Sequence, residues 1–141
     1  MGIITQADLA KSMHISRMQV SRIMREIKRE KLPLSDFDIL RVLTIKEIQK
    51  FGFTSAVAIE LLNEFEGELR FLHNSTENNC WVLFVEREDR SYRLTSLSKA
   101  HLHSVIDAVG MALVLPLHCI FAAAQYQLAK IKKAKAKQVA V

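Results

Sequence analysis

The chain has 141 residues, half of them hydrophobic, with a formal net charge of +5. This length fits about one domain with a real hydrophobic core. Cys80 and Cys119 lie far apart without a Cys-x-x-Cys spacing, so free thiols in a reducing cytoplasm are expected. His101 and His103 are two residues apart and would face different sides of a helix, so no metal site is expected. No cleavable signal peptide is expected at the start.

The charges are segregated along the sequence. Residues 1–31 carry seven Lys or Arg against three acids, residues 32–115 carry eight against twelve, and residues 116–141 carry five against none. Basic ends around an acidic middle fit a phosphate-facing head and a body that does not touch nucleic acid. A solvated surface with chance clustering of charge is the alternative.

Two short helices are expected within residues 5–27, TQADLAKSMHISRMQVSRIMREI. Thr5 with Asp8, and Ser16 with Gln19, form capping patterns, so two helix starts lie eleven residues apart and a tight turn must join the helices. The spacing of the apolar residues gives each helix one buried face. These faces comprise Leu9, Ala10 and Met13 in the first helix and Val20, Ile23, Met24 and Ile27 in the second.

The second helix leaves a row of polar and basic residues facing outward. Arginine can pair bidentately with guanine in the major groove, and serine or glutamine can bond bases or phosphates. The row therefore favours DNA reading, with an ordinary helical hairpin and a solvated basic face as the alternative. Its members are Ser16, Arg17, Met18, Ser21, Arg22 and Arg25.

Through Ile15-Ser16-Arg17 and Val20-Ser21-Arg22-Ile23, this stretch resembles the helix-turn-helix of bacterial regulators of the lactose-repressor and SorC kinds. The resemblance covers about a sixth of the chain. It implies that the first helix's opening residue, Gln6, holds a phosphate. The family usually has Gly at the turn, where this chain has His14, a residue that tolerates a left-handed backbone better than most. The expected base-reading residues are Arg17, Met18, Ser21 and Arg22, and the expected phosphate contacts are Gln6, Ser16, Gln19, Arg25 and Lys28.

The second helix is predicted to continue to Leu32, because a residue before a proline is pushed out of helical geometry. This gives a head over residues 1–32, an acidic unit with a hairpin over 33–97, and apolar helices with a basic tail over 98–141. In the middle unit, helices are expected over 34–43 and from Thr44 to Gly52.

A longer helix is expected over residues 55–72, with Val57, Leu61, Leu62 and Phe65 inward. With the helix before it, this gives a second outline faintly similar to regulators of the mercury-resistance (MerR) kind. Its groove-facing helix would present acids, which oppose phosphate binding, so core and protein contacts are expected. DNA contact in another orientation is the alternative. The acids are Glu60, Glu64, Glu66 and Glu68, and Glu47 lies where such a motif needs an apolar residue.

Residues 80–85, CWVLFV, form the clearest strand, and residues 91–95 are expected to return beside it as a β-hairpin. Arg87, Arg90 and Arg93 could make it a DNA-contacting wing, but neighbouring acids largely cancel them. A structural hairpin is the favoured interpretation. The predicted fold class is thus mainly α with one small β-hairpin.

The C-terminal part is expected to form one helix from Ser98 to Pro116 and another over residues 117–133. The 22 residues between Asp107 and Lys130 carry no formal charge, so they must be hidden from water. A membrane span is one solution, but Gly110 and Pro116 within the run argue against it. A homodimer interface is favoured, formed by Leu102, Val105, Ile106, Val109, Leu113, Leu117 and Phe121. The lysines of the tail, residues 130–138, either graze phosphates or only solubilise the chain.

These features favour a cytoplasmic, sequence-specific DNA-binding transcription regulator of bacterial or phage type, such as a repressor, acting as a homodimer on a palindromic operator. The alternative is a DNA-organising, partition or excision accessory protein, because the Thr-Gln-x-x-Leu-Ala opening is also similar to that of ParB-like partition proteins. An enzyme is not expected, because the chain has no phosphate loop, nucleotide fingerprint or nucleophile elbow. No cofactor and no small-molecule ligand are evident.

Overall fold

The computed structural model describes residues 3–28, 34–75 and 77–139. Over these residues it has seven helices and three strands, which confirms the predicted mainly α fold with a small β-hairpin, and the hairpin is part of a three-stranded sheet. The chain divides into two compact units, each described by itself below. Unit 1 comprises residues 1–67 and 120–141, and unit 2 comprises residues 68–119. The predicted ranges were 1–32, 33–97 and 98–141. Within unit 1, the last helix contacts the N-terminal helices through the ion pairs of Lys135 with Asp8 and Lys132 with Asp36.

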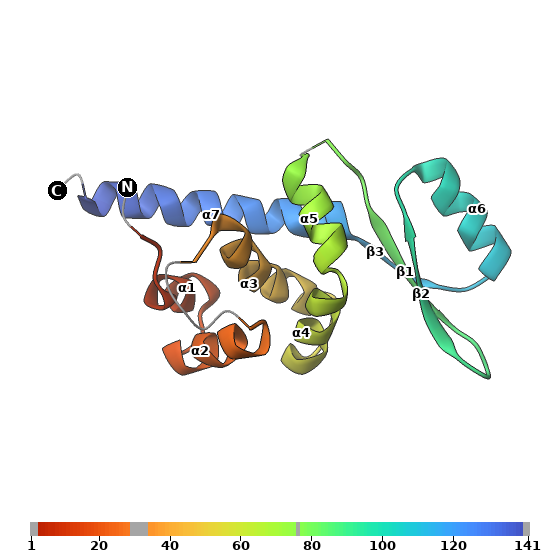
Figure 1. Cartoon of the computed structure of the whole chain (residues 1–141), viewed down its shortest axis with the longest axis horizontal. Coiled ribbons are helices and arrows are strands. Elements are labelled where there is room, and N and C mark those ends of the chain that lie inside the picture. Colours follow the sequence, from red (N-terminus) through yellow and green to blue (C-terminus); the bar gives the residue numbers. More distant parts are fainter. Residues whose placement is uncertain (1–2, 29–33, 76, 140–141) are drawn as a thin grey trace. The chain divides into compact units, whose positions relative to one another are not determined.

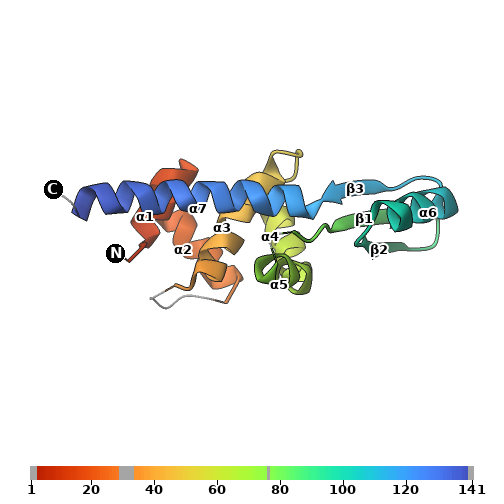
Figure 2. The same cartoon turned by 90° about the horizontal axis from the view of Figure 1, so that it is seen from above.

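Unit 1 is helical (Figure 1). Figures 1 and 2 show α7 running alongside α1 and α3, and α1 also contacts α2 and α3. Its largest fully buried side chains include Leu9, Val20, Met24, Ile45, Ile48, Leu62, Phe65 and Phe121. The helices of this unit are α1 (Gln6–Met13), α2 (Arg17–Glu26), α3 (Asp36–Gln49), α4 (Ser55–Glu64) and most of α7 (Leu117–Val139).

Helix α3 is continuous, although two helices were predicted over this stretch. Thr44 does not cap a second helix. Its hydroxyl donates to the carbonyl of Leu40 at 2.6 Å, one turn back in the same helix. The helix is buried on nearly all sides, so tertiary packing outweighs the local capping signal.

The predicted helix over residues 55–72 is instead two helices, α4 and α5 (Glu66–Asn74), which meet at Phe65. Phe65 ends α4 with a non-helical ψ of 12°, and Gly67 is a weak helix former in the next turn. Leu61, Leu62 and Phe65 are buried as predicted. The prediction for Val57 is wrong, because its side chain is 37% exposed.

Unit 2 contains an antiparallel sheet with the strand order β2-β1-β3. Strands β1 (Trp81–Glu86) and β2 (Ser91–Ser96) form the predicted hairpin, in the register that pairs Trp81 with Ser96. Helix α6 (Lys99–Val109) packs on the sheet, where Leu102 joins Trp81 and Leu83 in a buried cluster.

The third strand, β3 (Leu113–Pro116), was predicted to be helix, and that prediction is wrong. Gly110 ends α6 with a φ of +82°, which favours glycine. The chain beyond it then pairs with β1, placing Trp81 opposite Pro116. Helix α7 does begin at Leu117 as predicted, and it continues beyond Lys133 to Val139. Among the described residues, none of the helices combines the length and the hydrophobicity that a bilayer span requires.

Candidate nucleic-acid interface

Both predicted helix starts in residues 5–27 are present, each with a reciprocal capping box. Thr5 N donates to Asp8 Oδ2 at 2.8 Å, and Asp8 N donates to Thr5 Oγ1 at 3.3 Å. Ser16 N donates to Gln19 Oε1 at 2.9 Å, and Gln19 N donates to Ser16 Oγ at 3.1 Å. The side chains of Ser16 and Gln19, two of the expected phosphate contacts, are thus engaged in capping α2.

The turn between α1 and α2 passes through a left-handed residue. His14 has φ 57° and ψ 43°, the conformation expected where the family has glycine. The next amide, that of Ile15, donates to the Ala10 carbonyl at 3.1 Å and closes the end of α1. This geometry lets the two short helices pack on each other. Their buried residues are those predicted: Leu9, Ala10, Met13, Val20, Ile23, Met24 and Ile27.

With that face buried, the opposite face of α2 is open to solvent. All four expected base-reading residues are exposed, and the Met18 side chain is 80% exposed. Such an exposed methionine leaves its apolar side chain open to contact with another molecule. Of the expected phosphate contacts, Arg25 and Lys28 are exposed and Gln6 is half-buried.

Helix α2 ends earlier than predicted. Its last residue is Glu26, Ile27 caps it, and Lys28 has a φ of 63°. Lys28 therefore lies beyond the helix, and the predicted extension over residues 29–32 lies outside the described residues. The buried Ile27 side chain turns the chain inward at this point, which ends the exposed face.

The exposed face of α2 is strongly basic. The Nε of Arg22 lies 3.2 Å from Oε1 of Glu26, one turn further along the helix. Both side chains are exposed, so water screens the pair and it contributes little to stability. Within the residues that the structure describes, Arg17 and Arg25 make no ion pair. Three arginines therefore face solvent against one glutamate.

Three acidic residues of the middle region form ion pairs with cations of the same chain. Glu47 is buried and pairs with Lys50 at 2.8 Å, which accounts for an acid at a position expected to be apolar. In unit 1, Glu66 lies 3.8 Å from the Arg41 guanidinium, and in unit 2 Glu68 lies 3.5 Å from Arg93.

The arginines of the hairpin also have partners within unit 2. Arg87 donates to the Val109 carbonyl at 3.1 Å, and Arg90 lies 5.3 Å from the ring centre of Tyr92. Arg93 is the partner of Glu68. These contacts favour the structural hairpin over a DNA-contacting wing.

The residues expected at a dimer interface are not all available to a partner. Leu102, Leu117 and Phe121 are 8%, 0% and 2% exposed within a single chain. Leu113, on the edge strand β3, is 50% exposed. The remaining members, Val105, Ile106 and Val109, are half-buried. Sequence periodicity marks an apolar face but cannot tell an internal core from an interface.

No protein-family model and no curated protein matches this chain. Nor do three or more His, Cys, Asp or Glu side chains gather as a metal ion would need, as far as the described residues extend.

Proposed function

We propose that the protein is a sequence-specific DNA-binding transcription regulator, with α1 and α2 forming a helix-turn-helix and α2 entering the major groove. One observation carries the proposal. Two capped helices joined at a left-handed His14 bury one face of α2 and leave its arginines and Met18 exposed on the other. A short helix with exposed Arg and Ser is the size and chemistry that the major groove admits.

The roles of the exposed residues follow from their chemistry and position. Arg17 and Arg22 pair with guanine, Ser21 bonds a base edge, and Met18 contacts a thymine methyl group. To contact DNA, Arg22 has to break its ion pair with Glu26. This costs little free energy, because both side chains are exposed to water.

The phosphate contacts fix the register of α2 on the duplex without reading its sequence. Arg25 and Lys28 are the exposed cations at the far end of α2, and Gln6 opens α1. Ser16 and Gln19 contribute from the start of α2 while their side chains hold its cap.

A single α2 contacts only a few base pairs, so we propose that the protein acts as a homodimer on a palindromic site. Leu113 and the half-buried Val109 of α6 are the expected interface members that remain available, since Val105 and Ile106 pack against the Trp81–Leu83–Leu102 cluster. They lie in unit 2, beside the exposed Met111. In each copy the proposed reading helix belongs to unit 1 and the proposed dimer contacts belong to unit 2.

The decisive experiment is selection of bound duplexes from random DNA with the full chain. We expect a recurrent motif with two-fold symmetry. The double variant Arg17→Ala/Arg22→Ala should lose the motif, whereas Arg87→Ala/Arg90→Ala removes the same charge from the hairpin and should keep it. No enrichment with the unaltered chain, or loss of the motif with the hairpin variant, would overturn the proposal.

Mapping bound sites in a genome separates this function from the DNA-organising alternative. A regulator should occupy one or a few promoters. Spreading along DNA, or binding at an attachment site, would favour a partition or excision accessory protein that uses the same head.

A further inference from the structure

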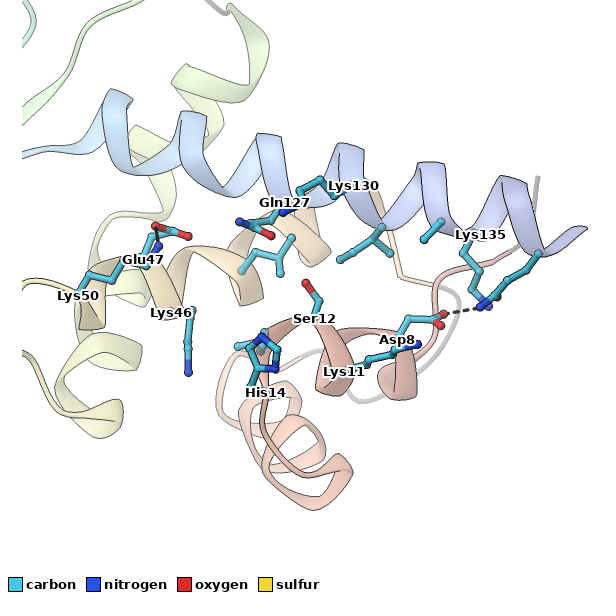
Figure 3. A pocket seen from close by; sticks show the side chains of 15 residues that line it. Asp8, Lys11, Ser12, His14, Lys46, Glu47, Lys50, Gln127, Lys130 and Lys135 are labelled. Atoms are coloured by element: carbon cyan, nitrogen blue, oxygen red, sulfur yellow. Dashed lines mark hydrogen bonds and ion pairs between the residues drawn. The ribbon is translucent and has the colours of Figure 1, made fainter.

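Side chains from three helices of unit 1 line one groove (Figure 3). Its volume is about 540 Å³, and its walls come from α1 with the following turn, from α3 and from α7. Small-molecule sites are typically about 300–1,000 Å³, so the groove has the size of a ligand site. It involves none of the expected base-reading residues.

The groove is lined by an excess of positive charge. Five lysines reach it against two carboxylates, Asp8 and Glu47. Both acids are already paired, since Lys135 Nζ lies 3.0 Å from Asp8 Oδ2 and Lys50 Nζ lies 2.8 Å from Glu47 Oε2. This leaves Lys11, Lys46 and Lys130, one from each helix, with no carboxylate partner among the described residues.

Three lysines without a carboxylate partner leave the groove with a net positive charge, which favours an anion. The three lysines come from three different helices, so the positive charge is not a run of lysines on one helix face. Lysine binds phosphate as a point charge with three donors. The net charge of the lining therefore favours an anion that carries several charges.

The other lining residues suit a small molecule rather than a bare ion. Ser12, Gln127 and His14 offer hydrogen-bonding groups around the same space (Figure 3). Leu43 and Ile131 add an apolar wall, and both are buried in unit 1. An apolar wall beside a cluster of cations matches a phosphorylated compound with an organic part.

We propose that this groove binds a small ligand carrying two or more phosphate groups, held by Lys11, Lys46 and Lys130. The site is separate from the exposed face of α2, and its test does not depend on the chain's binding DNA. Because the groove includes His14, an occupied site also contacts the turn that sets α2 on α1.

The test uses tripolyphosphate as the probe, titrated calorimetrically into the full chain at about 0.1 M salt, where distant surface charges are largely screened. We expect saturable binding with one ligand per chain. Lys46→Gln/Lys130→Gln should weaken it about tenfold or more, because each lost contact is a hydrogen bond to a charged group. Lys11→Gln alone, at an exposed position, should weaken it in the same direction.

The matched control is Lys133→Gln/Lys137→Gln. It removes the same amount of charge, both residues lie in α7 like Lys130, neither lines the groove, and both are exposed. This control should bind tripolyphosphate like the unaltered chain. Absence of binding to the unaltered chain would overturn the proposal, and so would equal losses in the groove and control variants, which would indicate a general charge effect.

A DNA arm identifies the source of the phosphates. If the Lys46→Gln/Lys130→Gln variant keeps its affinity for duplex DNA, the ligand is a small molecule as proposed. If duplex DNA displaces tripolyphosphate and this variant loses affinity for every duplex alike, the groove holds the DNA backbone and the small-ligand proposal fails.

Discussion

The ammonium of Lys135, near the end of α7, lies 3.0 Å from the carboxylate of Asp8 in α1. Asp8 also accepts from the backbone amide of Thr5, so one carboxylate both starts α1 and fastens it to the last helix. Both side chains are about one-fifth exposed. The pair therefore links the two ends of the sequence within unit 1.

This arrangement predicts a loss of stability in acid. Burial raises the pKa of the Asp8 carboxyl, but the hydrogen bonds from Thr5 and the charge of Lys135 outweigh burial and leave the pKa below its ordinary value. The stabilisation is complete above the unfolded-state pKa, about 4, and is lost as pH falls through the lower folded-state pKa. Urea unfolding from pH 6 down to pH 2 measures this loss.

Asp8→Asn should cost about 1 kcal/mol at pH 6 and flatten the acid limb of that profile. Asp107→Asn is the control, since Asp107 is exposed on α6 and has no such cap to hold. An acid limb that is just as steep in Asp8→Asn as in the unaltered chain would contradict the assignment.

Substitution of a base-reading arginine of α2 and of a phosphate-contacting one should reduce DNA affinity in different ways. Arg17→Ala should cost about 1–3 kcal/mol on the preferred duplex and relax preference at one base position. Arg25→Ala should weaken all duplexes alike and reduce the salt slope by about one. Fluorescence anisotropy over a salt series measures both. Equal, sequence-independent losses at the two positions would exclude base reading by Arg17.

The left-handed backbone of His14 predicts which substitutions the turn accepts. His14→Gly should leave stability unchanged or raise it by up to about 1 kcal/mol, because relief of the left-handed strain exceeds the added freedom of the unfolded chain. His14→Val should cost about 1–2 kcal/mol, since a β-branched residue is a poor fit at positive φ. Chemical unfolding measures both variants. Lys28, with φ 63°, is the matched position, and Lys28→Gly should follow the same direction. A His14→Val protein as stable as the unaltered chain would contradict the account.

Much of this head was predictable because its signals are local. A Thr or Ser followed three residues later by an acid or amide specifies a helix start with no help from the rest of the chain, and Thr5 and Ser16 both do so. The same reasoning failed at Thr44, whose hydroxyl bonds back to Leu40 inside a helix that its buried surroundings keep continuous.

The features that were missed depend on partners distant in sequence. Leu113–Pro116 is an apolar run that suits a strand or a buried helix, and pairing with β1 decides for the strand. The groove was missed for the same reason. Lys11, Lys46 and Lys130 are far apart in the sequence, and only the packing of α1, α3 and α7 brings them together.

The two cysteines should differ sharply in reactivity. Cys80 is buried, and burial together with the charge of Glu68, opposed by Arg93, raises the pKa of its thiol to about 11. Cys119 is exposed. A thiol reagent at pH 8 should therefore label Cys119 quickly and Cys80 only when the protein unfolds, because the thiolate is the reactive form. Mass spectrometry over time gives the two rates. Cys119→Ser should remove the fast phase, and comparable rates for both thiols in the native protein would contradict this burial.

The proposed dimer should depend on the exposed edge of the sheet. Leu113 is 50% exposed on β3, so Leu113→Glu leaves the core of unit 2 intact while placing a charge where a partner would bury a leucine. We expect the unaltered chain to sediment as a dimer at micromolar concentration and the variant to shift toward monomer, with at least tenfold weaker association, because an unpaired charge is costly to bury. Phe51→Glu is the matched control, since Phe51 is 52% exposed but lies outside the expected interface. A stable monomer of the unaltered chain would exclude the dimer. Equal dissociation by both variants would place the interface elsewhere. If the chain is a monomer, α2 would read a single half-site, and the affinity of the protein for DNA would be lower than that of a dimer.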